Sequence, residues 1–143
     1  MNRSKKELIR LLPYWHYKVE RTIRRNQTSK QISYETYFCL MTLKSCGQLK
    51  MGELANMLRL SKQQATHMVD SLYRYGLVER KENPNDRRSI YIGITDNGAH
   101  FLEENALHSE PFYNQLKQKF SDKEIEEFDD AVHTLLKFLE QLE

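Results

Sequence analysis

Two short amphipathic segments, separated by only two residues, constrain the fold of this chain more than any other feature. The first lies near residues 51–58, and the second begins after Ser61, a favourable N-cap residue, and closes at Gly76. Apolar side chains recur at spacings of three and four in both segments, which is typical of helices. Because Arg59-Leu60 alone separates them, the two segments predict a helix-turn-helix unit.

The periodicity then changes from that of a helix to that of a strand. Residues 77–82 form one predicted strand, and Ile90, Ile92 and Ile94 occupy alternate positions of a second. Between them, residues 83–86 (Asn-Pro-Asn-Asp) are frequent turn formers, so the two strands predict a β-hairpin. A hairpin directly after a helix-turn-helix unit predicts a winged helix.

Helical spacing continues on the N-terminal side of this unit. Residues 5–27 carry a helical pattern that Pro13 interrupts, so we expect the helix either to kink or to begin there. Ser33 is a good N-cap for a second helix that runs to about Ser45. That helix has almost no polar face, which predicts burial on most of its sides.

Two further helices are expected on the C-terminal side. Thr95-Asp96 opens a long predicted helix that reaches toward Lys119, with a kink at Pro111. Residues 121–124 read Ser-Asp-Lys-Glu, which is a capping box, and start a last helix with a wide apolar face.

Composition excludes several classes of protein. The chain has 143 residues, of which 39% are hydrophobic and 29% charged, so it can bury a main core and is not wholly disordered. No apolar run approaches the roughly 20 residues that span a bilayer. The N-terminus also lacks the apolar stretch of a secretory signal. We therefore expect a cytoplasmic protein that does not bind membranes.

The formal net charge of +2 conceals an asymmetry along the chain. Residues 1–92 carry 18 Lys or Arg and 8 Asp or Glu, whereas residues 93–143 carry 4 and 12. Separate basic and acidic regions favour one surface that meets a polyanion, although scattered solvated charges would give the same counts.

The second helix of the predicted unit sorts its side chains by face. Apolar residues, Ala65, Met68, Val69 and Leu72, point to the expected core, and Gln63, Thr66, His67, Asp70 and Arg74 form the opposite stripe. Gln can contact adenine, Thr can meet a thymine methyl group, and Lys binds phosphate or guanine, although a solvated face would also be polar. The candidates for DNA binding on this helix are Ser61, Lys62, Gln63, Gln64, Thr66, His67 and Arg74.

The expected wing favours the DNA-binding interpretation. Its turn carries Asp86, Arg87 and Arg88 on a protruding element with nothing evident to pack against. Arginine at the tip of a ribbon can enter the narrow minor groove, where the potential is most negative, and Asp86 can pair with the guanidinium and orient it. An arginine pair in a turn is usually just solvated, but here it directly follows a helix-turn-helix unit.

Several motifs in this order resemble the MarR family of bacterial regulators. They are Glu53-Leu54-Ala55, Leu60-Ser61, Gly76-Leu77-Val78-Glu79-Arg80, Asp86-Arg87-Arg88 and Ile94-Thr95-Asp96-Asn97-Gly98, where the family has Leu-Thr in place of Ile94-Thr95. The resemblance covers nearly the whole chain. It implies dimers built by the terminal helices, a wing arginine, matching Arg88, in the minor groove, and repression relieved by small lipophilic or phenolic ligands, by oxidation or by metal.

We therefore predict a mainly α fold with a small β-hairpin wing, in which residues 1–143 form a single domain. Residues 33–95 are its winged helix-turn-helix part, and residues 1–30 and 96–143 are its dimerisation helices. The predicted function is a transcriptional repressor that binds a pseudo-palindromic operator in double-stranded DNA as a homodimer and is released by a small-molecule signal.

Other constellations give less support to a function. Trp15, Tyr37, Phe38 and Phe101 are candidates to line an effector pocket, although aromatic residues at helical spacing more often pack in a core. His100, Glu104 and His108 recur every four residues, but two histidines about 12 Å apart along a helix cannot ligate one ion. We therefore expect no metal site and no cofactor.

The two cysteines and the remaining motifs leave three alternatives. Cys39 and Cys46 share the most apolar helix at a separation beyond disulfide reach, so we expect buried structural thiols. A thiol-based redox regulator, which needs an exposed cysteine of low pKa, and a metal-sensing regulator remain alternatives. A winged helix that binds protein is the third, although its exposed stripe would be apolar or acidic. The sequence has no catalytic motif, so we expect no enzyme.

Overall fold

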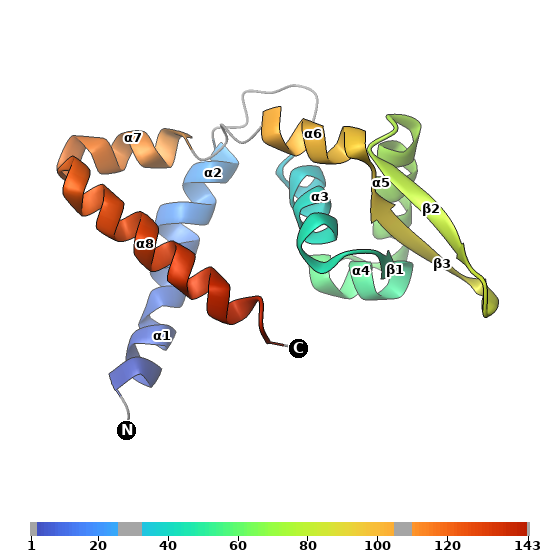
Figure 1. Ribbon diagram of the computed structural model, residues 1–143, viewed down its shortest axis with the longest axis horizontal. Coiled ribbons are helices and arrows are strands. Elements are labelled where there is room, and N and C mark those ends of the chain that lie inside the picture. Colours follow the sequence, from blue (N-terminus) through green and yellow to red (C-terminus); the bar gives the residue numbers. More distant parts are fainter. Residues whose placement is uncertain (1–2, 26–32, 105–109, 143) are drawn as a thin grey trace. The chain divides into compact units, whose positions relative to one another are not determined.

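The computed structural model describes residues 3–25, 33–104 and 110–142, and the chain divides into two compact units (Figure 1). The winged unit falls within residues 27–108, and the helical unit combines the two ends of the chain. Both units are mainly helical, and the strands that the structure describes belong to the winged unit. The predicted fold class, mainly α with a small β-hairpin wing, is confirmed. No helix in the described ranges is long and apolar enough to cross a bilayer.

The winged unit combines helices with a three-stranded antiparallel sheet of order β1-β3-β2. Its elements are α3 (Tyr34–Cys46), β1 (Leu49–Lys50), α4 (Met51–Leu58), α5 (Lys62–Arg74), β2 (Val78–Asn83), β3 (Asp86–Ile94) and α6 (Asp96–Glu104). Strand β1 was not expected, because two residues are too few to show an alternating pattern. Strand β3 begins earlier than the expected Ile90, because Asn83 pairs with Asp86 and closes the hairpin around Pro84-Asn85.

The turn between α4 and α5 confirms the predicted helix-turn-helix unit. Arg59 has a φ of 55°, in the left-handed region that non-glycine residues seldom adopt. The N–H of Leu60 donates to the carbonyl of Ala55 at 2.9 Å, which closes the end of α4. The chain changes direction within this turn, and α5 starts at Lys62.

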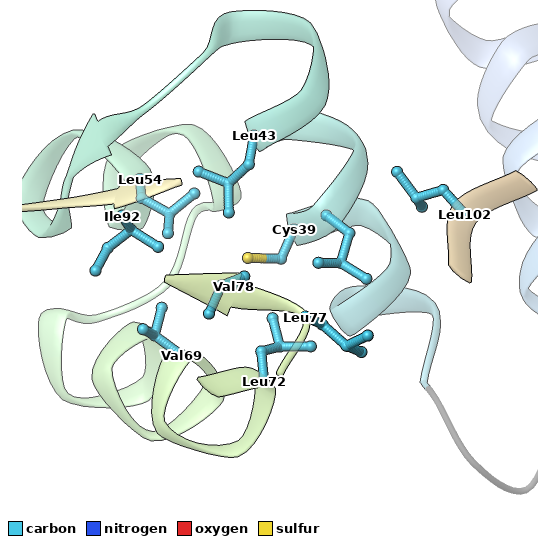
Figure 2. Packing of buried hydrophobic residues seen from close by; sticks show 10 residues of the cluster. Cys39, Leu43, Leu54, Val69, Leu72, Leu77, Val78, Ile92 and Leu102 are labelled. Atoms are coloured by element: carbon cyan, nitrogen blue, oxygen red, sulfur yellow. The ribbon is translucent and has the colours of Figure 1, made fainter. Parts of the chain in front are cut away.

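The core of the winged unit draws on each of its four described helices and on strands β2 and β3 (Figure 2). Its buried members are Cys39, Leu40, Leu43, Leu54, Val69, Leu72, Leu77, Val78, Ile92 and Leu102. Leu102 places α6 with this unit, whereas the sequence grouped residues 96–143 with the terminal helices. Fully burying a side chain such as leucine contributes about 1.5–3 kcal/mol, so this cluster stabilises the unit.

Thr95 and Gly98 fasten α6 to the base of the hairpin. The Thr95 hydroxyl donates to the carbonyl of Gly76 at 2.6 Å and accepts from the Gly98 N–H at 3.0 Å. A Cβ atom at position 98 would clash with the Leu77 carbonyl oxygen, so only glycine fits there without a shift. The Thr-x-x-Gly motif is thus explained by close packing.

The N-terminal helices of the helical unit follow one another without a break. They are α1 (Arg3–Tyr14), the π-helix η1 (Trp15–Glu20) and α2 (Arg21–Arg25). Pro13 lies at the end of α1, and the chain remains helical through it. Because proline has no N–H to donate to the preceding turn, the regular bonding pattern cannot continue, and the π segment follows directly.

The C-terminal helices are α7 (Glu110–Lys119) and α8 (Asp122–Leu139). The expected long helix is described as α6 and α7, and residues 105–109 between them lie outside the described residues. Pro111 lies in the first turn of α7 as described, and the kink predicted there stays a prediction, because it depends on residues 105–109. The predicted capping box is confirmed, because the Ser121 hydroxyl accepts from the Glu124 N–H at 3.3 Å.

The described residues of the helical unit form no core comparable with that of the winged unit. None of the described side chains of α1, η1, α7 and α8 is buried. Large apolar side chains remain accessible, with Leu12 61%, Leu136 50% and Phe138 66% exposed. Within the unit, Tyr113 donates a hydrogen bond to Asp129 at 2.8 Å, and this bond raises the pKa of Tyr113.

Candidate nucleic-acid interface

Helix α5 begins with a reciprocal pair of hydrogen bonds. The Ser61 hydroxyl accepts from the Gln64 N–H at 3.1 Å, and the Gln64 side-chain oxygen accepts from the Ser61 N–H at 2.9 Å. This capping box satisfies two backbone donors and fixes where the helix starts. The Gln64 side chain, a candidate for reading bases, is therefore already used by the helix start, whereas the Gln63 side chain has no such role.

The two faces of α5 separate as the sequence predicts. Ala65, Val69 and Leu72 are buried, and Met68 is half-buried. All of the candidates on this helix are exposed, namely Ser61, Lys62, Gln63, Gln64, Thr66, His67 and Arg74. The Thr66 hydroxyl donates to the Lys62 carbonyl at 2.7 Å, which leaves its methyl group for apolar contact.

A hollow of about 610 Å³ lies beside this exposed face. Its lining residues are Thr36, Gln63, Gln64, His67, Met68 and Ser71. Thr36 comes from α3 and the others from α5, so the start of α3 borders the same surface as residues 63–71 of α5. The exposed face of α5 is thus open and carries polar side chains, which suits contact with bases.

The wing is built as a tight hairpin whose turn is fixed by short polar side chains. The Asn83 side-chain oxygen accepts from the Asn85 N–H at 3.0 Å. Asp86 accepts from the Arg88 N–H at 3.0 Å and from the Ser89 hydroxyl at 3.4 Å. We expected Asp86 to pair with the Arg88 guanidinium, but the contact that the structure gives it is with the Arg88 backbone.

Arg87 and Arg88 are both exposed on the first residues of β3. The Asp86 contacts set the backbone of the hairpin at these positions, so they set the direction in which each side chain leaves the strand. The same unit therefore presents a polar helix face and a pair of cations on a projecting ribbon (Figure 1). This combination is typical of readers that use both grooves of a duplex.

The four candidate effector residues belong to different parts of the molecule. Trp15 lies in the helical unit, and Tyr37, Phe38 and Phe101 lie in the winged unit. Tyr37 and Phe101 pack against the winged core, and burial raises the pKa of Tyr37. Phe38 is 44% exposed and stacks on Tyr34. An effector site made by these four residues remains a prediction.

The sequence did not indicate a cavity of about 770 Å³ in the helical unit. Trp15 lines it together with residues of α1, η1, α7 and α8. The apolar stripes of these helices, at spacings of three and four, were its only signal. The polar groups at the cavity include Lys18, Gln115 and Lys119, so it offers an apolar wall with cations.

Two of the three residues considered as metal ligands, His100 and Glu104, lie on an exposed face of α6. His100 and Glu104 lie 3.7 Å apart on the surface of α6, and His108 lies outside the described residues. Within the described ranges, no three potential ligands gather as a metal site requires.

The two cysteines have opposite environments. Cys39 is buried in the winged core, where burial raises the pKa of its thiol to about 12. Cys46, at the end of α3, is exposed, so the prediction of a buried structural thiol is wrong at this position. The helix turns its last residue away from the core, and apolar composition alone does not show which positions face outward.

Comparison with known proteins was made against families, curated sequences and solved structures. Residues 32–90 match the model of the MarR family. The transcriptional repressor MprA of Escherichia coli (strain K12) is 31% identical over 114 residues. That alignment covers 78% of this chain and 65% of MprA, so the chain spans less than two thirds of the length of this relative.

Two solved structures illustrate the likeness in fold. A MarR family protein from Bacillus stearothermophilus has a TM-score of 0.66 and 29% identity, over 97% of this chain and 98% of that chain. A mutant MarR from E. coli complexed with operator DNA has a TM-score of 0.60 and 24% identity, over 91% of this chain and 94% of that chain. At 24% identity the second likeness concerns the fold alone.

Proposed function

Because this chain belongs to the MarR family of winged helix-turn-helix regulators, we propose that it is a sequence-specific DNA-binding regulator of transcription. It acts as a repressor and binds a pseudo-palindromic operator as a homodimer. The observation that carries the proposal is the pairing, within one compact unit, of the exposed face of α5 with the wing arginines Arg87 and Arg88. The similar protein MprA is named a transcriptional repressor, which supports repression rather than activation.

The helical unit supports the homodimer. Its described helices α1, η1, α7 and α8 bury no side chain, yet they carry leucine, tryptophan and phenylalanine residues at helical spacing. Contiguous apolar surface of this kind marks an interface, and a two-fold axis would place two copies of α5 on one face of a duplex. The expected operator is an inverted repeat with half-sites about 10 base pairs apart.

Selection of binding sites from random duplexes tests the proposal directly. Recovery of an inverted repeat is the expected result, and recovery of no common motif would contradict it. On the selected duplex, Gln63→Ala removes a base contact and lowers specific affinity by about 1–3 kcal/mol, with non-specific binding little changed. Lys123→Ala, an exposed cation in the first turn of α8, is the control and leaves both affinities unchanged.

The role of the wing is tested by whether removal of the Asp86 charge tightens or weakens operator binding. Arg88→Ala weakens operator binding strongly. Arg87→Ala mainly removes a phosphate contact, which reduces the slope of log affinity against log salt concentration by about one unit per site. Asp86→Ala removes a negative charge near DNA, which by simple electrostatics tightens binding. We expect the opposite, because Asp86 holds the Arg88 backbone at 3.0 Å. Tighter binding by Asp86→Ala together with wild-type binding by Arg88→Ala would contradict a role for the wing.

The signal that releases the repressor is a small lipophilic or phenolic effector. The cavity of about 770 Å³ in the helical unit supports an effector of this size, with Lys18 and Lys119 as partners for a phenolate or carboxylate. Calorimetric titration of the dimer with salicylate, with Lys18→Ala as the variant, measures such binding. Unchanged operator affinity in the presence of bound salicylate would contradict it as a releasing signal.

A thiol-based regulator is the second candidate, and the exposure of Cys46 favours it. Oxidation by peroxide would then lower operator affinity in the wild-type protein and have no effect on Cys46→Ser. Equal responses of the two proteins to peroxide would eliminate this candidate.

A further inference from the structure

An ion pair joins the recognition helix to the wing. The Arg80 guanidinium on β2 donates to the Asp70 carboxylate on α5. The carbon at the centre of the same guanidinium lies 4.8 Å from the centre of the Tyr73 ring, which is also on α5. We call these three residues the clasp. In Figure 1, β2 runs beside α5.

The clasp lies where the hairpin leaves the core. Arg80 is paired in register with Ile92, which is fully buried. Beyond this pair, the next residues of β2, Lys81 and Glu82, are exposed, as are Arg87 and Arg88. The direction of the projecting part is therefore set at its base, and the clasp is a side-chain contact between that base and α5.

An acidic residue such as Asp70 is unexpected on a surface that is proposed to face DNA, unless its contact contributes to binding. It is the only acidic residue in α5, on the helix expected to face a polyanion. The Asp70 and Arg80 side chains are 49% and 34% exposed, and an ion pair this accessible contributes little to folding stability. A carboxylate here repels phosphate, so a gain elsewhere must offset that cost.

We propose that Asp70 and Arg80, with Tyr73 beneath them, are positioning residues that hold the wing at a fixed angle to α5. With that angle set in the free protein, the helix face and the wing arginines meet the two grooves of one duplex together. An element that is ordered before binding loses less conformational entropy on binding, and affinity rises accordingly. The inference rests on the proposed DNA-binding function and adds residues that contact the wing rather than DNA.

The test compares two carboxylates with different partners. Asp70 on α5 contacts Arg80 on β2, whereas Glu79 contacts a residue of its own strand. Asp70→Asn removes the charge of the clasp with little change in shape. Glu79→Gln removes an equal charge from the hairpin, but the Glu79 partner is Lys81, 3.1 Å away on the same strand. Both proteins are titrated against a duplex carrying the selected inverted repeat and against a random-sequence duplex of equal length, over a salt series.

The clasp predicts opposite results for these two variants. Asp70→Asn weakens binding to the selected duplex by about 3- to 10-fold, the scale of ordering one or two side chains anew. Its loss on the random duplex is smaller, because that duplex requires no fixed angle. Glu79→Gln binds both duplexes as tightly as wild type or more tightly, since it only removes a repulsive charge.

A double-mutant cycle separates positioning from direct contact. If Arg80 acts through Asp70, adding Asp70→Asn to an Arg80→Gln protein causes no further loss of affinity. Arg80→Lys, which keeps the charge but loses the planar stacking on Tyr73, weakens binding as well. Thermal unfolding and sedimentation of each variant should match wild type, so that the losses report on binding.

Four outcomes would overturn the clasp. Tighter binding and steeper salt dependence of Asp70→Asn would show that Arg80 is a DNA contact that Asp70 merely restrains. Additive losses in the cycle would show that Asp70 and Arg80 act independently. Equal losses for Asp70→Asn and Glu79→Gln would show that the effect does not depend on which partner the carboxylate contacts. If the wild-type protein selects no duplex, the proposed function itself fails and the clasp fails with it.

Discussion

The two units of this chain use similar shares of apolar residues in different ways. In the winged unit, leucines from separate helices are fully buried, as with Leu43 and Leu54 at 1% and 0% exposure. In the helical unit, residues of the same type, such as Leu12 and Leu136, remain half or more exposed. The first arrangement stabilises a fold within one chain, whereas the second leaves apolar surface that the proposed homodimer would bury.

The largest expected effect is a loss of dimer stability caused by a substitution on α8, and it tests this comparison directly. Leu136→Asp places a charge in the exposed apolar face, which a two-fold interface would bury twice. Losing about 1.5–3 kcal/mol per buried side chain weakens the dimer by about 3–6 kcal/mol. Sedimentation at micromolar concentration should show a dimer for wild type and a monomer for the variant. Thr134→Asp, on the opposite face of α8, should remain dimeric, and a dimeric Leu136→Asp would contradict the interface.

A core substitution in the winged unit should act on folding instead. Leu54→Ala removes a fully buried side chain of α4 and costs about 2–5 kcal/mol of unfolding free energy. Denaturant unfolding followed by circular dichroism, at fixed protein concentration, measures this loss. A change below about 1 kcal/mol would mean that the cluster in Figure 2 is not the stabilising core.

The base of the wing offers a smaller and more local test. Gly98→Ala places a Cβ atom against the Leu77 carbonyl, and relieving that contact costs about 1–3 kcal/mol. Gly52→Ala is the matched control, because a Cβ at position 52 meets nothing within 4 Å and alanine favours a helix. Thermal unfolding should therefore shift in opposite directions, and equal shifts would contradict close packing at Gly98.

The smallest expected effect concerns the two cysteine thiols, whose reactivity can be compared in the wild-type protein without any substitution. Burial raises the pKa of the Cys39 thiol to about 12, so at pH 9 the folded protein keeps it protonated and shielded. Iodoacetamide should label Cys46 alone until denaturant is added, as peptide mass spectrometry would show. Because its folded-state pKa is raised, Cys39 stabilises the fold below its ordinary pKa of 9.0, and this contribution falls as pH rises toward 12. Rapid labelling of Cys39 in the folded protein would contradict its burial.

Local sequence predicted those features that depend on neighbouring residues. Ser33, Ser61 and Ser121 were recognised as N-caps because a short hydroxyl side chain bonds the first turn that follows it. The two faces of α5 followed from helical spacing for the same reason. Features that depend on a distant partner were missed or wrong, such as strand β1, which exists only by pairing with β3.

The amino-acid sequence by itself determined where helices begin, which face of α5 is polar, and that a hairpin with two arginines follows it. Those properties arise from spacing and capping within a few residues. Only the tertiary structure decided that Asp70 meets Arg80 across elements, that Gly98 must lack a side chain, and that Cys46 is exposed while Cys39 is buried. Each of these depends on how separate elements pack in space, and packing is fixed by the whole core rather than by any local pattern.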